Sequence, residues 1–232
     1  MMRSRPIIAI DGPVGAGKST VARELARALG FSYINTGAMY RAVALVARER
    51  GISPDDAQID QRLAGILDVI AISFDGERVL LSGRDITAAI AAPEVGDLAS
   101  RLSTLTIVRG KMRELQRGAG RDGGVVMEGR DIGTAIFPDA EFKFFLDADV
   151  EVRAERRWRE LVAKGASATR DEVRAQLIER DRRDSERELA PLRRADDAII
   201  IDSTRLSIAE VVAAMKARVE ATSRALKGLK PT

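Results

Sequence analysis

Short runs of apolar residues recur along the chain, and longer segments rich in polar residues separate them. The runs occupy residues 7–10, 31–34, 125–127, 142–146 and 198–201. Continuous apolar runs of this length are typical of parallel strands that are buried on both faces of a sheet. The pattern therefore predicts an α/β chain in which helices connect the strands of a parallel sheet.

The segment after the first run predicts a helix. Val21, Leu25 and Leu29 repeat every four residues, and Gly30 follows as a helix stop. A glycine-rich stretch lies between the run and this helix, so we expect a strand, a glycine loop and a helix in direct succession.

Alternating apolar and polar residues predict a small antiparallel insertion. The alternation covers residues 70–74 and 79–81 and flanks Asp75-Gly76, a pair that is favoured in two-residue hairpin turns. Further along, residues 147–197 are dense in Arg, Glu and Asp and predict two solvent-exposed helices joined near Lys164-Gly165. We expect this weakly packed segment to move.

Composition narrows the functional classes. With 232 residues, of which 45% are hydrophobic, the chain can form one domain with insertions. Its 38 Lys and Arg nearly balance 35 Asp and Glu, which argues against a basic nucleic-acid-binding surface. Cys and His are absent, which excludes disulfides and a histidine general base. The apolar start is too short for a signal peptide or a membrane span, so we expect a cytoplasmic protein.

A motif with clear chemistry follows the first predicted strand. Residues 12–19 read GPVGAGKS and fit the phosphate-loop spacing G-x-x-x-x-G-K-[ST], in which backbone N–H groups surround phosphates. We expect Lys18 to neutralise the β- and γ-phosphates and Ser19 to offer its hydroxyl to Mg²⁺. A glycine-rich turn without a ligand is the alternative, but so many glycines would be costly there. The expected ATP-binding residues are Gly12, Pro13, Val14, Gly15, Ala16, Gly17, Lys18, Ser19 and Thr20.

Two further polar motifs follow predicted strands. Residues 35–41 read NTGAMYR after the second strand, and residues 128–134 read EGRDIGT after the third. The carboxyl ends of parallel strands are where open sheets bind ligands. The Asn-Lys-x-Asp element by which GTPases read guanine is absent, since the chain holds one Asn, at position 35.

These motifs resemble those of bacterial cytidylate kinases, which combine a G-x-x-G-x-G-K-[ST] loop with T-G-A-[MI]-Y-R and G-R-D-[IM]-G-T elements. The hairpin near residues 66–90, FFLDA at 144–148 and RDRRD at 180–184 leading to APL at 190–192 match as well. The resemblance spans residues 6 to about 220. It implies the fold of a P-loop nucleoside monophosphate (NMP) kinase: a five-stranded parallel sheet flanked by helices, a small antiparallel NMP-side insertion and a helical lid.

The resemblance divides a single kinase domain into regions. These are a core at residues 6–65, 100–148 and 190–222, an NMP-side insertion at 66–99, a lid at 150–189 and a flexible tail at 223–232. Two residues depart from the family pattern. Asn35 stands where an Asp is often found, and Glu128 stands where other members have Asp. Both substitutions keep a polar side chain.

The resemblance also implies which residues bind the acceptor nucleotide. They are Thr36, Tyr40, Arg41, Ser100, Arg109, Arg130, Asp131, Arg180, Asp184 and Arg187. Arginine suits this task because its guanidinium forms bidentate bonds to a phosphate. Arg180, Asp184 and Arg187 are spaced i, i+4, i+7 and would share one helix face, although a solvated helix laced with ion pairs has the same spacing.

Arginines of the lid are candidates for transition-state stabilisation. Arg153, Arg156 and Arg157 fall within one turn, and a closing lid would bring them onto the transferring phosphoryl group, where an arginine contributes roughly 10³ to 10⁵ in rate. The alternative is a surface helix with Glu151 and Glu155 as ion-pair partners. The expected catalytic residues are Lys18, Arg153, Arg157 and Asp131.

Together these residues predict transfer of the γ-phosphoryl group of ATP to CMP or dCMP, with Mg²⁺ accompanying ATP. A monophosphate acceptor has a second pKa near 6 and is mostly a dianion at neutral pH, so no general base is needed. Two alternatives stay open: a P-loop kinase of a small hydroxyl substrate, which would need an Asp base, and a nucleotide-dependent regulatory protein. We expect a monomer without nucleic-acid or membrane partners, and Asp11 and Glu128 are both candidates for the carboxylate contact to Mg²⁺.

Overall fold

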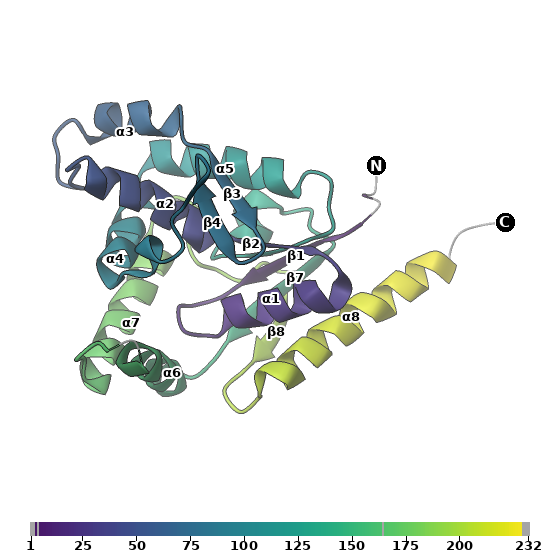
Figure 1. Cartoon of the computed structure of the whole chain (residues 1–232). Coiled ribbons are helices and arrows are strands. Elements are labelled where there is room, and N and C mark those ends of the chain that lie inside the picture. The colour runs from purple at the N-terminus through teal and green to yellow at the C-terminus, as the bar shows by residue number, and fades with distance from the viewer. Residues whose placement is uncertain (1–2, 4, 164, 229–232) are drawn as a thin grey trace. The chain divides into compact units, whose positions relative to one another are not determined.

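The chain divides into two compact units. The computed structural model describes residues 3, 5–163 and 165–228, with side chains described up to residue 222 (Figure 1). Unit 1 comprises residues 1–33, 122–186 and 190–232, and unit 2 comprises residues 34–121 and 187–189. Unit 1 thus contains the glycine loop and the charged segment, whereas unit 2 contains the antiparallel insertion.

A five-stranded sheet confirms the strands that the apolar runs predict. Its order is β2-β6-β1-β7-β8. The strands are β1 (Ile7–Asp11), β2 (Ser32–Asn35), β6 (Val125–Glu128), β7 (Phe142–Asp147) and β8 (Ile199–Asp202). Central β1 is parallel to both neighbours, with Ile10 paired to Glu128 on one side and to Phe144 on the other. The carboxyl ends of β1 and β6 therefore lie at the same edge of the sheet.

Two helices pack against this sheet in unit 1. Helix α1 (Lys18–Leu29) and helix α8 (Ile208–Gly228) run side by side (Figure 1). Val21 of α1 and Met215 of α8 join Phe144 of the sheet in one buried apolar cluster. This cluster fixes the start of α1, and hence the glycine loop, relative to β1.

The ends of these helices test two further predictions. Gly30 closes α1 in the left-handed region, with φ of 63°, and its N–H bonds to the carbonyls of Ala26 and Arg27, which confirms the helix stop. Helix α8 continues to Gly228, beyond Ser223, where the sequence predicts a tail. Alanine, arginine, leucine and lysine in this stretch have high helix propensity. Residues 229–232 of the predicted tail lie outside the described chain.

The charged segment forms the two predicted helices, α6 (Val150–Ala163) and α7 (Arg170–Glu186). Ala154, Val173 and Leu177 are their buried contacts, and they form a small apolar cluster. The predicted junction falls on Lys164, which lies outside the described residues, and on Gly165. Within the ranges described, no helix is long and apolar enough to cross a bilayer.

The end of α7 corrects one expectation. The helix ends at Glu186, so Arg187 does not share a helical face with Arg180 and Asp184. The chain turns back after the helix, and the N–H of Leu192 bonds to the carbonyl of Asp184.

Unit 2 is built from helices around the insertion. Its helices are α2 (Thr36–Glu49), α3 (Ile59–Leu67), α4 (Pro93–Leu102) and α5 (Thr106–Gly120), with a short 3₁₀ turn, η1 (Ala89–Ala91). Its core includes the fully buried side chains of Leu45, Leu63, Leu102 and Met112.

The antiparallel insertion is present and contains one more strand than the alternation predicts. Strands β3 (Ile72–Asp75), β4 (Arg78–Leu81) and β5 (Arg84–Asp85) form a three-stranded sheet. Asp75 pairs with Arg78, so the turn residues are Gly76-Glu77, with Gly76 at φ 59°. The predicted Asp75-Gly76 turn was therefore wrong by one residue. Asp75 belongs to the strand, where its side chain forms an ion pair with Arg78, its partner in the ladder.

Candidate active site

Three glycines shape the loop between β1 and α1. Gly12, Gly15 and Gly17 have φ of 149°, 79° and 90°, values that side chains rarely adopt. A Cβ atom at residue 12 would lie 2.0 Å from the carbonyl oxygen of Leu146, and one at residue 15 would lie 3.2 Å from Cβ of Arg153. The loop therefore passes close to the end of β7 and to α6, and its path requires glycine.

Lys18 lies within this loop and is 5% exposed. Its Nζ donates to the carbonyl oxygen of Pro13 at 2.6 Å. Burial and, to a smaller extent, the charge of Arg130 lower the pKa of Lys18 to about 7, against the opposing attraction of Glu128 and other carboxylates. A phosphate next to this amine would supply the negative charge that stabilises its protonated form.

The start of α1 faces the loop as a suitable anion site. Gly17 is the N-cap and contributes no side-chain hydrogen bond, and the first turn contains no acidic residue. The positive end of the helix dipole is therefore not offset by a carboxylate of the helix itself. Ser19 and Thr20 are exposed on this first turn.

Asp11 fastens the segment after β6 to the strand that precedes the loop. Its buried carboxylate accepts the N–H groups of Ile132 at 2.8 Å and Gly133 at 2.7 Å. Both belong to η2 (Ile132–Ile136), a turn of π-helix of the kind often found at functional sites. Burial raises the pKa of Asp11 to about 6, against the lowering effect of the two N–H groups.

Glu128 and Ser19 are connected through Tyr33. The Tyr33 hydroxyl donates to Oε1 of Glu128 at 2.8 Å and shares a hydrogen bond with the Ser19 side chain. Burial raises the pKa of Tyr33 well above its ordinary value, so this hydroxyl keeps its proton. Glu128, one of the two departures from the family pattern, thus orients the phenol beside Ser19.

The structure brings Arg130 and Asp184 together from distant parts of the sequence. Nε of Arg130 donates to Oδ2 of Asp184 at 2.9 Å, and the two side chains are 19% and 7% exposed. Asp131 is buried and directly precedes η2. Arg180 lies one turn before Asp184 on α7 and is half-buried.

Arg153 is engaged with backbone and with a carboxylate. Its Nε donates to the carbonyl of Ala148 at 3.0 Å, and its Nη1 donates to the carbonyl of Val14 at 2.9 Å. The same Nη1 donates to Oδ2 of Asp181. In this conformation the guanidinium of Arg153 supports the phosphate loop from the side of α6.

The other two arginines of this turn have different partners. Nη2 of Arg156 donates to the carbonyl of Ser203 at 2.7 Å, and the hydroxyl of Ser203 in turn donates to the carbonyl of Ala16 at 3.2 Å. Arg157 donates to Glu160 at 2.7 Å in an i,i+3 pair. Arg153 and Arg157, both predicted as catalytic, therefore do not share a partner among these contacts.

In unit 2, predicted acceptor-binding residues surround the start of α2. The side chain of Asn35 accepts the N–H of Ala38 at 3.0 Å and caps α2, a role in which Asn and Asp are equivalent. Thr36 follows it and is buried. The guanidinium carbon of Arg109 lies 6.0 Å from the centre of the Tyr40 ring.

Arg41 and Ser100 are also held within unit 2. Nη1 of Arg41 donates to the carbonyl of Ile90 at 2.6 Å. Gly96 permits this position, because a Cβ there would lie 2.7 Å from Nη2 of Arg41. Ser100 is buried, and its carbonyl accepts the hydroxyl of Ser103 at 2.8 Å. Arg187 is half-buried and belongs to unit 2.

The site residues fit Mg²⁺ that arrives with a nucleotide. Among the described residues, no group of three or more His, Cys, Asp or Glu side chains is placed to hold a metal ion. Both oxygens of Asp11 already accept N–H groups, and Glu128 accepts from Tyr33. The exposed Ser19 hydroxyl is a suitable single ligand, because Mg²⁺ usually keeps several waters and takes its other oxygens from substrate phosphates.

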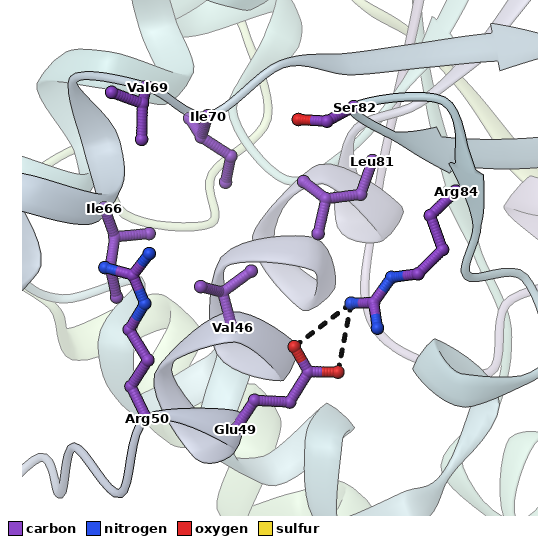
Figure 2. A pocket seen from close by; sticks show the side chains of 9 residues that line it. All are labelled: Val46, Glu49, Arg50, Ile66, Val69, Ile70, Leu81, Ser82 and Arg84. Atoms are coloured by element: carbon purple, nitrogen blue, oxygen red, sulfur yellow. Dashed lines mark hydrogen bonds and ion pairs between the residues drawn. The ribbon is translucent and has the colours of Figure 1, made fainter.

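A cavity of about 370 Å³ lies within unit 2, and Figure 2 shows the side chains that line it. Its lining residues are Val46, Glu49, Arg50, Ile66, Val69, Ile70, Leu81, Ser82 and Arg84. Aliphatic side chains form its centre, and Arg84 donates to both carboxylate oxygens of Glu49 at 3.0 Å on its rim. None of the predicted site residues lines this cavity, so we do not assign it to phosphoryl transfer.

Sequence reasoning missed two residues that contact the loop. Asp181 accepts the N–H of Val14 at 3.1 Å, and the hydroxyl of Ser203 donates to Ala16. Asp181 lies inside RDRRD, between two residues to which the resemblance gives a role. Ser203 directly follows β8, at the edge where ligands of parallel sheets bind. The RDRRD motif and the position after a predicted strand were both visible in the sequence, but neither specifies a contact to the loop.

A parallel sheet whose central strand leads through a glycine loop and a buried lysine into a helix defines a P-loop nucleotide-binding protein, and the arginine-rich helices beside it are typical of a kinase lid. The family described as "Cytidylate kinase" matches residues 8–221. The chain belongs to the cytidylate kinase family and is a kinase.

Similar proteins extend over nearly the whole chain. A cytidylate kinase of Geobacter sulfurreducens is 50% identical over 226 residues, which cover 96% of each chain. One of Carboxydothermus hydrogenoformans is 50% identical and covers 89% of this chain and 93% of its own. The crystal structure of an uncharacterized protein from Eubacterium ventriosum has a TM-score of 0.53 at 14% identity, covering 93% of this chain and 99% of that one, and shows the fold alone.

Proposed function

We propose that this kinase transfers the γ-phosphoryl group of ATP to CMP and dCMP, giving ADP with CDP or dCDP. The observation that carries the proposal is its identity of about 50% to curated cytidylate kinases over most of its length. The geometry agrees with it, since Lys18 of the phosphate loop is buried and Arg130 of the 128–134 motif is held by an ion pair with the buried Asp184.

The donor side of the reaction falls to the phosphate loop. Residues 12–20 would bind the β- and γ-phosphates through backbone N–H groups and the dipole of α1. Lys18 would exchange its bond to Pro13 for the phosphates, whose negative charge restores its protonated form. It would then stabilise the charge that develops on the transferred group.

We assign acceptor binding to the residues that the resemblance indicates. They are Arg130, Asp131, Arg180 and Asp184 of unit 1, and Thr36, Tyr40, Arg41, Ser100, Arg109 and Arg187 of unit 2. The arginines would bind the monophosphate in bidentate fashion and align its attacking oxygen. Asp184 supports this role, because it fixes the guanidinium of Arg130 before substrate arrives.

The chemistry requires alignment more than proton transfer. An oxygen of the acceptor phosphate, already a dianion, attacks the γ-phosphorus in line while the bond to the β-phosphate oxygen of ADP breaks. We assign transition-state stabilisation to Lys18 and the lid arginines. Arg157 would exchange its exposed i,i+3 partner Glu160, whereas Arg153 would have to leave Val14 and Asp181.

We propose that Ser19 contributes the protein ligand to the Mg²⁺ that accompanies ATP. When bound, Mg²⁺ neutralises phosphate charge as the transferred group passes between oxygens. The hydrogen bond between Ser19 and Tyr33 supports the assignment, because it orients the hydroxyl next to the loop. The monomeric state, the cytoplasmic location and the absence of nucleic-acid partners stay predictions.

The test is ADP release with ATP, Mg²⁺ and each of CMP, dCMP, UMP, AMP and GMP in parallel. The proposal expects CMP and dCMP to accelerate release well beyond the others. Acceleration by none of the five would contradict it and would favour a hydroxyl acceptor or a regulatory ATPase. Acceleration by UMP alone would refute the assigned base.

A further inference from the structure

Val14, the third residue of the phosphate loop, is held by the lid helices. Its N–H donates to Oδ1 of Asp181 at 3.1 Å, and its carbonyl accepts from Nη1 of Arg153 at 2.9 Å. Its side chain packs against the apolar cluster of α6 and α7 that includes Val173 and Leu177. Both polar groups of this peptide position are therefore satisfied by the lid.

The carboxylate that holds Val14 is neutralised and mostly buried. Asp181 pairs with Arg153, and their side chains are 18% and 9% exposed. Arg153 also bonds to the carbonyl of Ala148, so the pair is anchored to the end of β7. While the pair is intact it adds no net charge beside the loop, and removal of one partner leaves a buried charge without compensation.

The same turn of α7 contacts the acceptor motif. Asp184 follows Asp181 by three residues and accepts from Nε of Arg130 at 2.9 Å. Side chains three apart lie on one face of a helix. A shift of this turn would therefore change the support of the phosphate loop and the support of Arg130 together.

We propose that Asp181 is a positioning residue that sets the phosphate loop at Val14 and, through α7, couples the loop to Arg130. The coupling rests on the proposed function, in which Arg130 binds the acceptor. Without Asp181 the peptide of Val14 loses its acceptor, and the loop must be ordered when the nucleotide binds. Nucleotide affinity falls as a result.

The positioning role can be tested without an acceptor. Calorimetry would measure binding of a non-hydrolysable ATP analogue with Mg²⁺ to wild type, Asp181→Ala, Asp181→Asn and the control Glu179→Gln. Glu179 is an exposed residue of α7 that pairs with Arg182. We expect the Asp181→Ala variant to bind about tenfold more weakly or worse, and the control to stay within about twofold of wild type.

The Asp181→Asn variant keeps the test valid if the Asp181→Ala variant does not fold. Asn keeps an oxygen that accepts the N–H of Val14, so its loss of affinity should be smaller than that of the alanine variant. Thermal unfolding of each variant shows whether it is folded, and the isosteric asparagine variant carries the comparison if alanine is not tolerated. Wild-type affinity in the folded Asp181 variants would overturn the positioning role.

The coupling is tested by repeating the titration with saturating CMP. We expect CMP to change the wild-type affinity for the analogue by about fivefold or more, and the control to keep this ratio. The ratio should fall toward one in the Asp181→Ala variant, which a merely structural role would not cause. A wild-type ratio of one, or an unchanged ratio in the variant, would overturn the coupling. If CMP does not bind to wild type at all, the proposed function and the coupling fail together, and the titration without acceptor still decides the positioning role.

Discussion

Lys18 donates to the carbonyl oxygen of Pro13 at 2.6 Å, so the amine of the phosphate loop closes a ring with the loop's own backbone. The amine is thereby held next to the loop in a buried site, and burial lowers its pKa because it disfavours the charged form. An anionic ligand stabilises the charged form of this amine. Binding therefore gains free energy that a neutral ligand could not provide.

Replacement of Lys18 should separate activity from stability. Lys18→Met should abolish measurable turnover yet raise the free energy of unfolding of the nucleotide-free protein by on the order of 1–3 kcal/mol near pH 6, because a buried charge is removed. The pKa of Lys18 is about 7 when folded against 10.5 for the free side chain. Between these values the unfolded state binds more protons, so wild-type stability rises with pH and the advantage of Met shrinks. Urea unfolding of wild type and variant at pH 6 and pH 9.5 measures the difference in their free energies of unfolding at each pH. A Met variant less stable than wild type at pH 6 would contradict the explanation.

Asp11 should give the opposite dependence on pH. Its pKa is about 6 when folded against 3.8 for the free carboxyl, so between these values the folded state binds more protons and wild-type stability falls as pH rises. Asp11→Asn does not titrate. The difference in unfolding free energy between the two proteins should therefore shift in favour of the variant by roughly 2 kcal/mol from pH 4.5 to pH 7.5. A constant difference across this range would show that the carboxylate is not penalised by burial.

Gly12 and Gly65 form a matched pair of glycine substitutions. Gly12→Ala would place Cβ 2.0 Å from the backbone oxygen of Leu146, whereas Gly65, inside α3, has nothing within 4 Å of the new atom. We expect Gly12→Ala to lower the melting temperature and to abolish nucleotide binding. Gly65→Ala should stabilise the protein by roughly 0.5–1 kcal/mol, as alanine does within a helix. Calorimetric melting with and without ATP tests both, and tolerance of alanine at residue 12 would mean that the loop is not compressed there.

Gly96 should affect the acceptor rather than ATP. Gly96→Ala would push the guanidinium of Arg41, 2.7 Å from the new Cβ, away from the carbonyl of Ile90. Because the displaced atoms end a flexible side chain, we expect the fold to be kept. The KM for CMP should rise by roughly tenfold while the KM for ATP changes little. Steady-state kinetics with each substrate varied in turn measures the two values, and an equal rise in both would argue against a role of Arg41 in acceptor binding.

The sequence was most informative where short-range rules determine the structure. Ile7–Asp11 is recognisable as a strand because it is buried on both faces, and Gly30 is recognisable as a stop because glycine readily adopts the left-handed region. The Lys18 motif predicted its loop for the same reason, since glycine spacing encodes backbone geometry directly.

Contacts between residues far apart in the sequence could not be predicted, because local sequence patterns do not contain them. The spacing of Arg180, Asp184 and Arg187 predicted that they share one helix face, but α7 ends at Glu186. The hydrogen bond from Leu192 to Asp184 that follows this helix end leaves no periodic pattern in the sequence. The same holds for Asp181, whose partners Val14 and Arg153 are 167 and 28 residues away. A charged residue in a charged helix resembles a solvated one until the fold places the loop against it.

The bonds from Asp11 to Ile132 and Gly133 connect positions 121 and 122 residues apart. Contacts of such sequence separation form slowly, because a long loop must close before they provide any stabilisation. While the ribosome is still producing the chain ahead of β6, strand β1 lacks a neighbour and Asp11 has no N–H groups to bind. The nascent protein therefore spends the first half of its synthesis without a finished phosphate site, and a fragment that ends before residue 125 should not retain ATP on an affinity resin.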